Sequence, residues 1–320
     1  MAVISAPLWQ QITINSDQSP LSYGISYNER EKVIFTGTAR KAPGDTSVKI
    51  RPNDVCANFL YQGIPFDIED PATEFSPAPI IRLFDIEKLP IGETIETVEF
   101  YLDWSYDNSM SRDDWRLAPI DSRVTPHMLI LATRIGAVGL SATIRDNDMG
   151  VLGDFAIEDL QPADATNFSI LVGDVLAQYP NARFIEIGDI KYEIIDKCPS
   201  YALYYVNAYG GWESLRLAQG IQGETLYRWG FERGDSNVNY LNEITETWRL
   251  GTDWLTDEGA KNMPHLIGST QVLLHDLEKN KVYPVILTDT SLEIKSYANQ
   301  GRQIVRYDIS VQRAQTHIRK

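Results

Sequence analysis

The chain has 320 residues, of which 43% are hydrophobic and 23% are charged, and its formal net charge is −15. This length favours two or three domains, and no segment reaches the ~20 apolar residues that a membrane-spanning helix needs. Affinity for a phosphate backbone comes from Lys and Arg, so the acidic balance argues against binding of nucleic acid. We therefore expect a soluble multidomain protein without a membrane or a specific nucleic-acid partner.

The acidic charge has two interpretations. The first is ordinary solubility, which we favour from the usual meaning of net charge. The second requires many copies of the chain around a conduit through which DNA slides, where an acidic wall would keep the DNA from sticking. The charge by itself does not separate these two interpretations.

The start of the chain and its cysteines indicate a cytoplasmic product. The first residues lack the basic segment and sustained apolar core of a secretory signal. Cys56 and Cys198 are far apart in the sequence, and neither has neighbours that would complete a zinc site. We expect both to be buried thiols without a disulfide.

Short alternating apolar runs, separated by Gly, Pro, Asn and Asp, predict an all-β fold. Residues 1–20 are either the first strand of the local sheet, which we favour, or an arm that reaches another subunit. Further strands are expected from Val33, Val48 and Ile80. We place an N-terminal β domain at 1–91.

A middle β domain is expected at 92–181. Its clearest strand places alternate residues on one apolar face: Val98, Phe100, Leu102 and Trp104. Further strands are expected from His127, Val138 and Asn167, with an internal loop or connection around Pro162.

A C-terminal β domain is expected at 182–320. It opens with a hairpin whose turn is at Gly188 and Asp189. The next hairpin, Tyr201–Gly220, is apolar or aromatic on both faces, so we expect another sheet or subunit to cover each face. Tyr204 and Tyr205 should be buried, and the turn uses Tyr209, Gly210 and Gly211.

One short helix is expected in this domain, near 256–267. Thr256 can cap its N-terminus, Asp257 and Glu258 suit the positive end of its dipole, and Gly268 marks its end. Pro264 removes an internal hydrogen-bond donor, so the helix is kinked or consists of two turns in succession. The predicted fold class is thus all-β, with two or three β-sandwich or barrel-like domains and this one helix.

The sequence offers no catalytic, cofactor-binding or metal-binding residues. None of the four histidines has a spacing that places two ligands on one face: His127, His265, His275 and His317. Nucleophile elbows and phosphate-binding glycine loops are also missing. The segment from Asp146 to Gly150 resembles the start of a calcium loop, but it lacks the downstream bidentate Glu, so we favour an Asx turn.

Two residue classes keep other functions open. Neighbouring carboxylates could serve a glycosidase, but sequence neighbours rarely meet in the required geometry: Asp113 with Asp114, and Glu69 with Asp70. The aromatic residues, 16 Tyr, 10 Phe and 7 Trp, could stack on sugars. We expect Trp104, Trp229 and Trp248 to pack in a core or interface, and we leave Trp212 open.

Several segments resemble a C-terminal module of virion proteins from tailed bacteriophages, crAss-like gut phages in particular. The aromatic run ends in a Gly-Trp turn at Gly211 and Trp212, a helix start follows at Trp254–Glu258, and strands from Val272 to Val311 close the sheet. Gly259 and Pro264 depart from this pattern by weakening the helix. The segments from Val33, Ile50 and Tyr101 also look like parts of such proteins.

The resemblance implies a non-enzymatic structural subunit of a ring around the DNA channel, in the tail, the tail hub or the head–tail connector. Its partners would be further copies of the chain and other tail or portal-connector proteins. It would be located in the virion tail after assembly in the host cytoplasm. The alternative is a carbohydrate- or receptor-binding module at the tail tip, and the third possibility is a cell-wall glycosidase.

Overall fold

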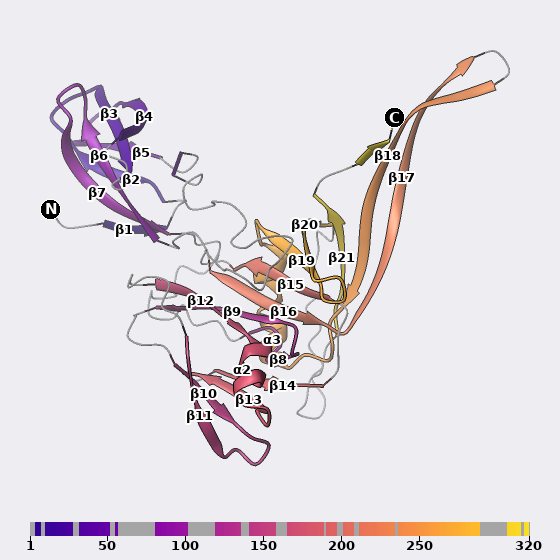
Figure 1. Cartoon of the computed structure of the whole chain (residues 1–320). Helices are drawn as coiled ribbons and strands as arrows, with labels where there is room; N and C mark the ends of the chain where they lie inside the picture. Colours follow the sequence, from indigo (N-terminus) through magenta and orange to yellow (C-terminus); the bar gives the residue numbers. More distant parts are fainter. Residues whose placement is uncertain are drawn as a thin grey trace. The chain divides into compact units, whose positions relative to one another are not determined.

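The computed structural model describes fourteen segments of the chain (Figure 1): 4–7, 10–27, 32–51, 55–56, 81–101, 119–135, 141–157, 165–188, 190–196, 201–207, 211–233, 236–288, 306–314 and 317–319. Most of these residues are in strands, and the helices are short, which confirms the all-β prediction. The described residues form two compact units, one ending at Tyr101 and the other beginning at Pro119.

The N-terminal unit contains a five-stranded sheet of order β1-β7-β6-β3-β4 and a separate pair, β2 with β5. Its strands are β1 (Ile4–Pro7), β2 (Ile12–Asn15), β3 (Leu21–Tyr27), β4 (Lys32–Ala39), β5 (Ser47–Ile50), β6 (Ile81–Lys88) and β7 (Glu93–Tyr101). Both sheets contribute to one core, with Ile14 and Val48 from the pair and Ile25, Phe84 and Phe100 from the larger sheet. The unit is therefore built as two sheets over a shared core.

β1 pairs in parallel with β7, with Ile4 opposite Val98. This part of the N-terminal segment is thus a strand of the local sheet. β7 buries Val98 and Phe100 on the apolar face predicted from its alternation. Leu102 and Trp104, expected on the same face, lie outside the described residues.

The second unit begins with a five-stranded sheet of order β11-β10-β13-β14-β8 and the pair β12 with β9. Its elements are β8 (Arg123–Val124), β9 (Leu129–Ile135), β10 (Ser141–Arg145), β11 (Val151–Ala156), β12 (Ala165–Leu171), α2 (Val172–Gln178), β13 (Phe184–Ile187) and β14 (Ile190–Ile194). The predicted hairpin at Gly188 is present between β13 and β14, and Gly188 has a φ of +63°. Asp189 lies outside the described residues.

The expected strand from Asn167 through Gly173 is wrong in its second part, because α2 begins at Val172. Val172 and Val175 are three positions apart and both bury their side chains in the same core as Ile144 and Ile185. This packing outweighs the preference of valine for strands.

The C-terminal sheet has eight strands in the order β16-β15-β19-β20-β21-β18-β17, with β22 also paired to β18. Its elements are β15 (Tyr201–Val206), β16 (Trp212–Leu217), β17 (Gln219–Arg233), β18 (Ser236–Gly251), α3 (Asp257–Lys261), α4 (Met263–Ile267), β19 (Val272–Asp276), β20 (Lys281–Leu287), β21 (Asp308–Arg313) and β22 (His317–Arg319).

The sheets do not coincide with the three expected domain ranges. The expected boundary at 91 falls in the turn between β6 and β7, which pair along their length. The expected boundary at 181 separates β10 from β13, which pair in one sheet with Ile144 opposite Ile185. Local turn signals mark strand ends equally well inside a sheet and between domains, so they misplace both boundaries.

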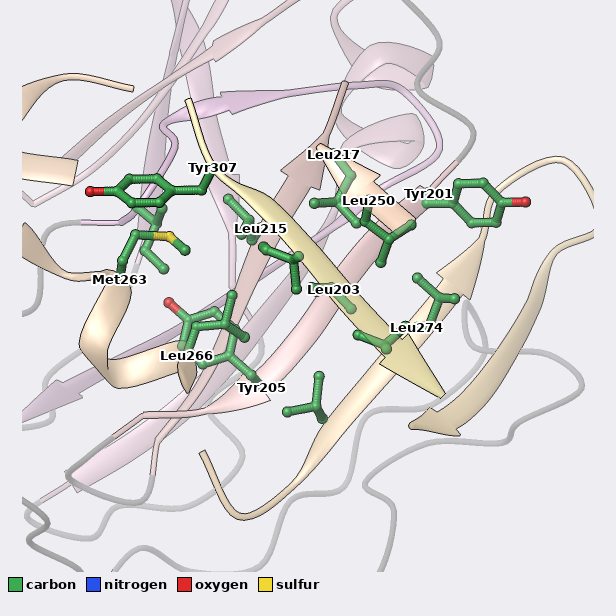
Figure 2. Packing of buried hydrophobic residues seen from close by; sticks show 14 of the residues in the cluster. Tyr201, Leu203, Tyr205, Leu215, Leu217, Leu250, Met263, Leu266, Leu274 and Tyr307 are labelled. Atoms are coloured by element: carbon green, nitrogen blue, oxygen red, sulfur yellow. The ribbon is translucent and has the colours of Figure 1, made fainter. Parts of the chain in front are cut away.

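The hairpin of β15 and β16 is buried along both strands and on both faces. On one face, Leu203, Tyr205 and Leu215 pack with Met263 and Leu266 of α4 (Figure 2). On the other face, residues of β15 and β16 pack with β9 and β19: Ala202, Tyr204, Trp212, Leu129, Leu131 and Leu273. The hairpin is therefore covered on both faces by the same chain, by β9 on one face and by the helix α4, instead of a sheet or a subunit, on the other.

The predicted helix is present as two successive short helices, α3 and α4. The Thr256 hydroxyl accepts a hydrogen bond from the backbone N–H of Gly259 at 3.2 Å, as expected of an N-cap. Pro264 lies in the first turn of α4, where its missing N–H is tolerated. A Cβ added to Gly259 would lie 2.1 Å from the carbonyl oxygen of Ile120. This glycine therefore allows α3 to approach the segment before β8.

Candidate functional site

The described residues contain no group of three or more His, Cys, Asp or Glu side chains that could hold a metal ion. Asp146 forms the Asx turn that the sequence favoured, because its Oδ1 accepts from the backbone N–H groups of Asp148 at 2.9 Å and Gly150 at 2.7 Å. The turn joins β10 to β11. Within the described part of the chain, no helix has the length and hydropathy to cross a membrane.

His275 of β19 is held in one tautomer by a chain of hydrogen bonds. His275 Nε2 donates to Asn280 Oδ1 at 3.2 Å, because an amide oxygen can only accept. In the neutral ring Nδ1 is then the acceptor, so the Tyr204 hydroxyl donates to it at 2.8 Å and accepts from the backbone N–H of Leu129 at 3.4 Å. Burial lowers the pKa of His275, although its bond to Asn280 opposes this shift. Both ring nitrogens are engaged, so His275 has a structural role in this arrangement.

His275 lies beside a pocket of about 280 Å³. Besides His275, the pocket is lined by Pro126, His127, Leu129, Leu171, Gly173, Leu277 and Asn280. His127 is exposed, whereas burial lowers the pKa of His265 on α4. His317 lies on β22. Two of the four histidines, His127 and His275, thus line this pocket, whereas His265 and His317 are not among its lining residues.

Glu213 of β16 is a buried acid inside the C-terminal core. Its Oε2 accepts from the Tyr205 hydroxyl at 2.6 Å, and its Oε1 accepts from Asn207 Nδ2 at 2.8 Å. Burial raises the pKa of Glu213 to about 7, although both hydrogen bonds work in the opposite direction. Asn207 Oδ1 in turn accepts from the backbone N–H of Gly211 at 2.9 Å. The acid therefore belongs to a network that fixes the ends of β15 and β16.

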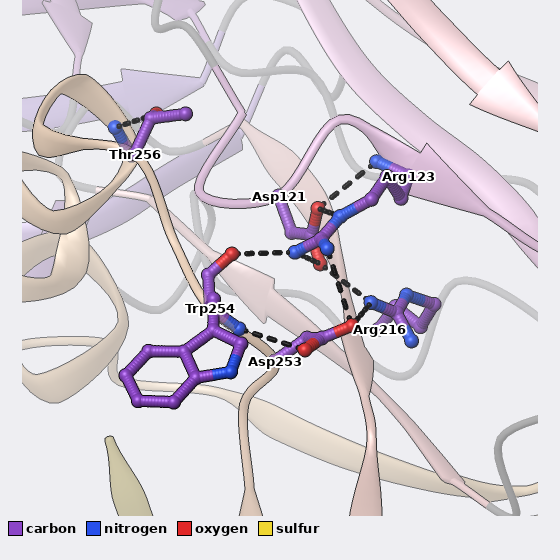
Figure 3. Close-up of polar contacts among 7 residues, drawn as sticks. Asp121, Arg123, Arg216, Asp253, Trp254 and Thr256 are labelled. Atoms are coloured by element: carbon purple, nitrogen blue, oxygen red, sulfur yellow. Dashed lines mark hydrogen bonds and ion pairs between the residues drawn. The ribbon is translucent and has the colours of Figure 1, made fainter. Parts of the chain in front are cut away.

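A second polar cluster joins β16 to two loops through ion pairs (Figure 3). Arg216 is almost fully buried, and its Nη2 donates to Asp121 at 3.2 Å and to Asp253 at 2.9 Å. Arg123 Nε donates to Asp121 at 2.8 Å, and its Nη1 donates to Asp253 at 3.1 Å. The cluster contains two positive and two negative side chains, so its charges balance.

The positive charges of this cluster lower the pKa of Asp253. Burial alone would raise its pKa, but hydrogen bonds from Arg216 and from the backbone N–H of Trp254, together with the charge of Arg123, lower the pKa. Arg123 also donates to the Trp254 carbonyl oxygen at 2.7 Å. The four charged side chains neutralise one another and hold the two loops to β16, which indicates a structural cluster.

Among the described residues, the aromatic side chains around Trp212 are buried and do not form the solvent-facing platform that the sugar-binding alternative needs. Trp212, which the sequence left open, is only 5% exposed, and Trp248 is buried as predicted. Trp254 is 59% exposed beside the ion cluster. Trp104 lies outside the described residues, as does the side chain of Trp229.

The remaining site residues considered from the sequence are placed as follows. Cys56 is a buried free thiol, as expected, and burial raises its pKa to about 12. The carboxylate pairs considered for a glycosidase, Asp113 with Asp114 and Glu69 with Asp70, lie outside the described residues, and so does Cys198.

Sequence reasoning missed the two buried charged residues of β16, Glu213 and Arg216. A signal for them was present, because both interrupt a strand whose faces were expected to be covered. A charged side chain in such a strand needs a buried partner. The partners of Arg216, Asp121 and Asp253, are distant in the sequence and could not be named from spacing.

β17 and β18 form a long two-stranded ribbon that continues past β21 in Figure 1. They pair from Gln219 with Gly251 to Arg233 with Ser236. β21 pairs with β18 only at 247–251, and β22 only at 242–244. Among the described residues, no strand pairs with the outer edge of β17. This open edge is the part of the sheet best suited to contact another chain.

The described structure therefore offers buried structural clusters and one long open edge. No protein-family model matches this chain, and no curated protein matches it.

Proposed function

We propose that the chain is a non-enzymatic structural subunit of a tailed-phage virion, which forms a ring around the DNA channel in the tail or tail hub. The proposal is supported by the positions of the residues through which the chain resembles the phage virion module. Trp212 packs in the core of the C-terminal sheet, and Thr256, within the Trp254–Glu258 segment, caps α3. Trp212 thus stabilises the sheet and Thr256 stabilises a helix, so the residues of the resemblance have structural roles.

Two further features support an assembly role. The open edge of β17 offers backbone hydrogen-bonding groups to a neighbouring chain. The net charge of −15 suits a wall along which DNA slides, because a phosphate backbone finds few cations to bind. A ring requires a contact between two different surfaces of neighbouring subunits, repeated by rotation until it closes.

Native mass spectrometry and negative-stain microscopy of the purified chain test this proposal. We expect closed rings of several subunits, alone or together with neighbouring tail proteins of the same phage. A monomer at high protein concentration, with no ring even when those neighbouring proteins are added, would count against the proposal.

The carbohydrate-binding alternative relied on exposed rings near Trp212. Trp212, Tyr204 and Tyr205 are buried, so they do not supply such a platform. A glycan array still tests this alternative: binding that is lost in a Trp254→Ala variant would support it, because Trp254 is the exposed ring beside the ion cluster.

A further inference from the structure

The open edge of β17 carries an exposed apolar residue that an isolated edge strand does not favour. Ile221 is 71% exposed, and its neighbours Gln222, Gly223 and Glu224 are also exposed. Edge strands are commonly short, or protected by proline, a bulge or inward-pointing charges, because a long open edge templates pairing with another chain. β17 has 15 residues, and its proximal half carries an apolar side chain in water.

Glu224 is in an unfavourable position within its own ribbon. In the register of β17 and β18 it stands directly opposite Glu246. Glu246 is already bound to Arg313, whose Nη1 donates to it at 2.5 Å. Like charges directly opposite each other destabilise a strand pair. A cation arriving from the outer edge of β17 would relieve this arrangement.

We propose that β17 pairs edge to edge with β17 of a second copy of this chain, antiparallel and centred on Leu226. In that register Glu224 stands opposite Arg228 of the second copy, and the two-fold axis repeats the same pair. Ile221 stands opposite Phe231, and Gly223 stands opposite Trp229. The first pair joins opposite charges, the second joins two apolar side chains, and the third places an aromatic residue opposite a glycine. Pairs of these three kinds stabilise neighbouring strands.

Other registers lose this complementarity. A shift that centres the pairing on Thr225 or Tyr227 separates Glu224 from Arg228. A shift that centres it on Glu224 or Arg228 sets like charges opposite each other. Centring between two residues pairs side chains of opposite faces. The register centred on Leu226 is also the one that pairs β17 over its whole length, from Gln219 to Arg233.

The contact goes beyond the proposed ring. A two-fold contact uses the same surface on both chains and closes in a dimer, whereas a ring uses two different surfaces. The result is a four-stranded sheet of order β18-β17-β17-β18, in which both β17 edges are paired. Because the dimer occupies the β17 edge, a ring would have to use other surfaces of the chain, and the two proposals are tested separately.

A charge exchange tests the proposed pair. Glu224→Arg places Arg opposite Arg228 at two symmetric positions, so we expect the dimer to dissociate about tenfold more readily at low salt. Combining Glu224→Arg with Arg228→Glu restores two opposite-charge pairs and should restore association. Glu232→Arg is the matched control, because Glu232 stands opposite Gly220 in this register. Sedimentation equilibrium of the full-length chain measures the dissociation constant.

Cysteine crosslinking tests the register itself. Leu226→Cys places a thiol next to its own copy on the two-fold axis, so mild oxidation should give a disulfide-linked dimer. Thr225→Cys is the control, because Thr225 stands opposite Tyr227 and not opposite itself. The unchanged chain reports any crosslinking through Cys56 or Cys198.

Each outcome decides the proposal. Loss of association in Glu224→Arg, rescue in the double variant and selective crosslinking at Leu226→Cys support it. A wild-type chain that shows no dimer, an equal dissociation constant for all variants, or equal crosslinking at 225 and 226 overturns it. Rings that persist in Glu224→Arg with no crosslink at 226 would overturn the β17 pair and leave the ring proposal intact. A dimer that crosslinks at 226 but never forms rings would support the β17 pair and overturn the ring proposal.

Discussion

At the scale of single residues, Glu213 couples folding to pH. Its pKa is about 7 in the folded chain, against an ordinary value of 4.5. Between these values the unfolded chain loses a proton that the folded chain keeps, so stability falls as the pH rises. The buried acid stabilises the fold fully below about pH 4.5, and its ionisation costs about 3 kcal/mol once the pH exceeds 7.

Glu213→Gln should remove this decline, because an amide cannot ionise. Urea unfolding of both proteins from pH 5 to pH 8 measures the effect, and the difference between their free energies of unfolding should grow with pH in favour of the variant. Glu258→Gln is the control, since Glu258 is exposed on α3. If the difference for Glu213→Gln were constant across this range, the acid would not be the group that titrates.

Arg216 provides a second residue-scale prediction. Arg216→Met leaves Asp121 buried with one cation fewer, and breaking a buried ion pair in this way costs about 3 kcal/mol. We expect a clear fall in the midpoint of urea unfolding. Arg249→Met, an exposed position on β18, should change the midpoint little. Equal effects of the two substitutions would mean that the ion cluster adds nothing to stability.

At the scale of elements, the position of α3 depends on Gly259. In an ordinary helix interior Gly→Ala gains up to about 1 kcal/mol. Here the new Cβ would lie 2.1 Å from the Ile120 carbonyl oxygen, so the backbone must move apart and overpacking should dominate. We expect Gly259→Ala to lower the free energy of unfolding by about 2 kcal/mol.

Thermal and urea unfolding compare this variant with Glu258→Ala, a substitution at an exposed position of the same helix. The control should unfold close to the wild type. A Gly259→Ala protein that is as stable as the control would show that α3 and the Ile120 segment can separate without cost.

Much of the element content was predictable from the sequence, because alternation and caps are local. The strands at Val33 and Val48, the hairpin at Gly188 and the Thr256 cap all follow from residues within a few positions of one another. The helix α2 was not predictable in this way, since its valines turn helical to fill a core made by distant strands. The expected domain boundaries at 91 and 181 do not match the sheets for the same reason. Pairing between distant strands decides which segments belong to one sheet.

The buried charges mark a similar limit for the candidate site. The sequence indicated that both faces of β15 and β16 would be covered. Glu213 and Arg216 are charged residues in a strand that was otherwise expected to be buried. Their partners come from loops before β8 and after β18, and only the fold brings these together. The open edge of β17 also follows from the order of strands in the sheet, which no local pattern encodes.

At the scale of the whole molecule, the net charge of −15 predicts that the chain does not retain DNA. A gel-shift assay with duplex DNA at low salt should show no retardation, even at high protein concentration. A basic DNA-binding protein serves as the positive control. Retardation that weakens as salt rises would reveal phosphate contacts and would contradict the acidic-wall interpretation.

The ion cluster around Arg216 also sets the order in which the second unit can mature during synthesis. Asp121 and Arg216 are 95 positions apart, and Arg123 and Asp253 are 130 positions apart. The ribosome adds ~5–20 residues per second, so Asp253 follows Arg123 after an interval on the order of ten seconds. Arg216 is therefore synthesised before its partner Asp253, and the ion cluster cannot close until the loop after β18 has been added.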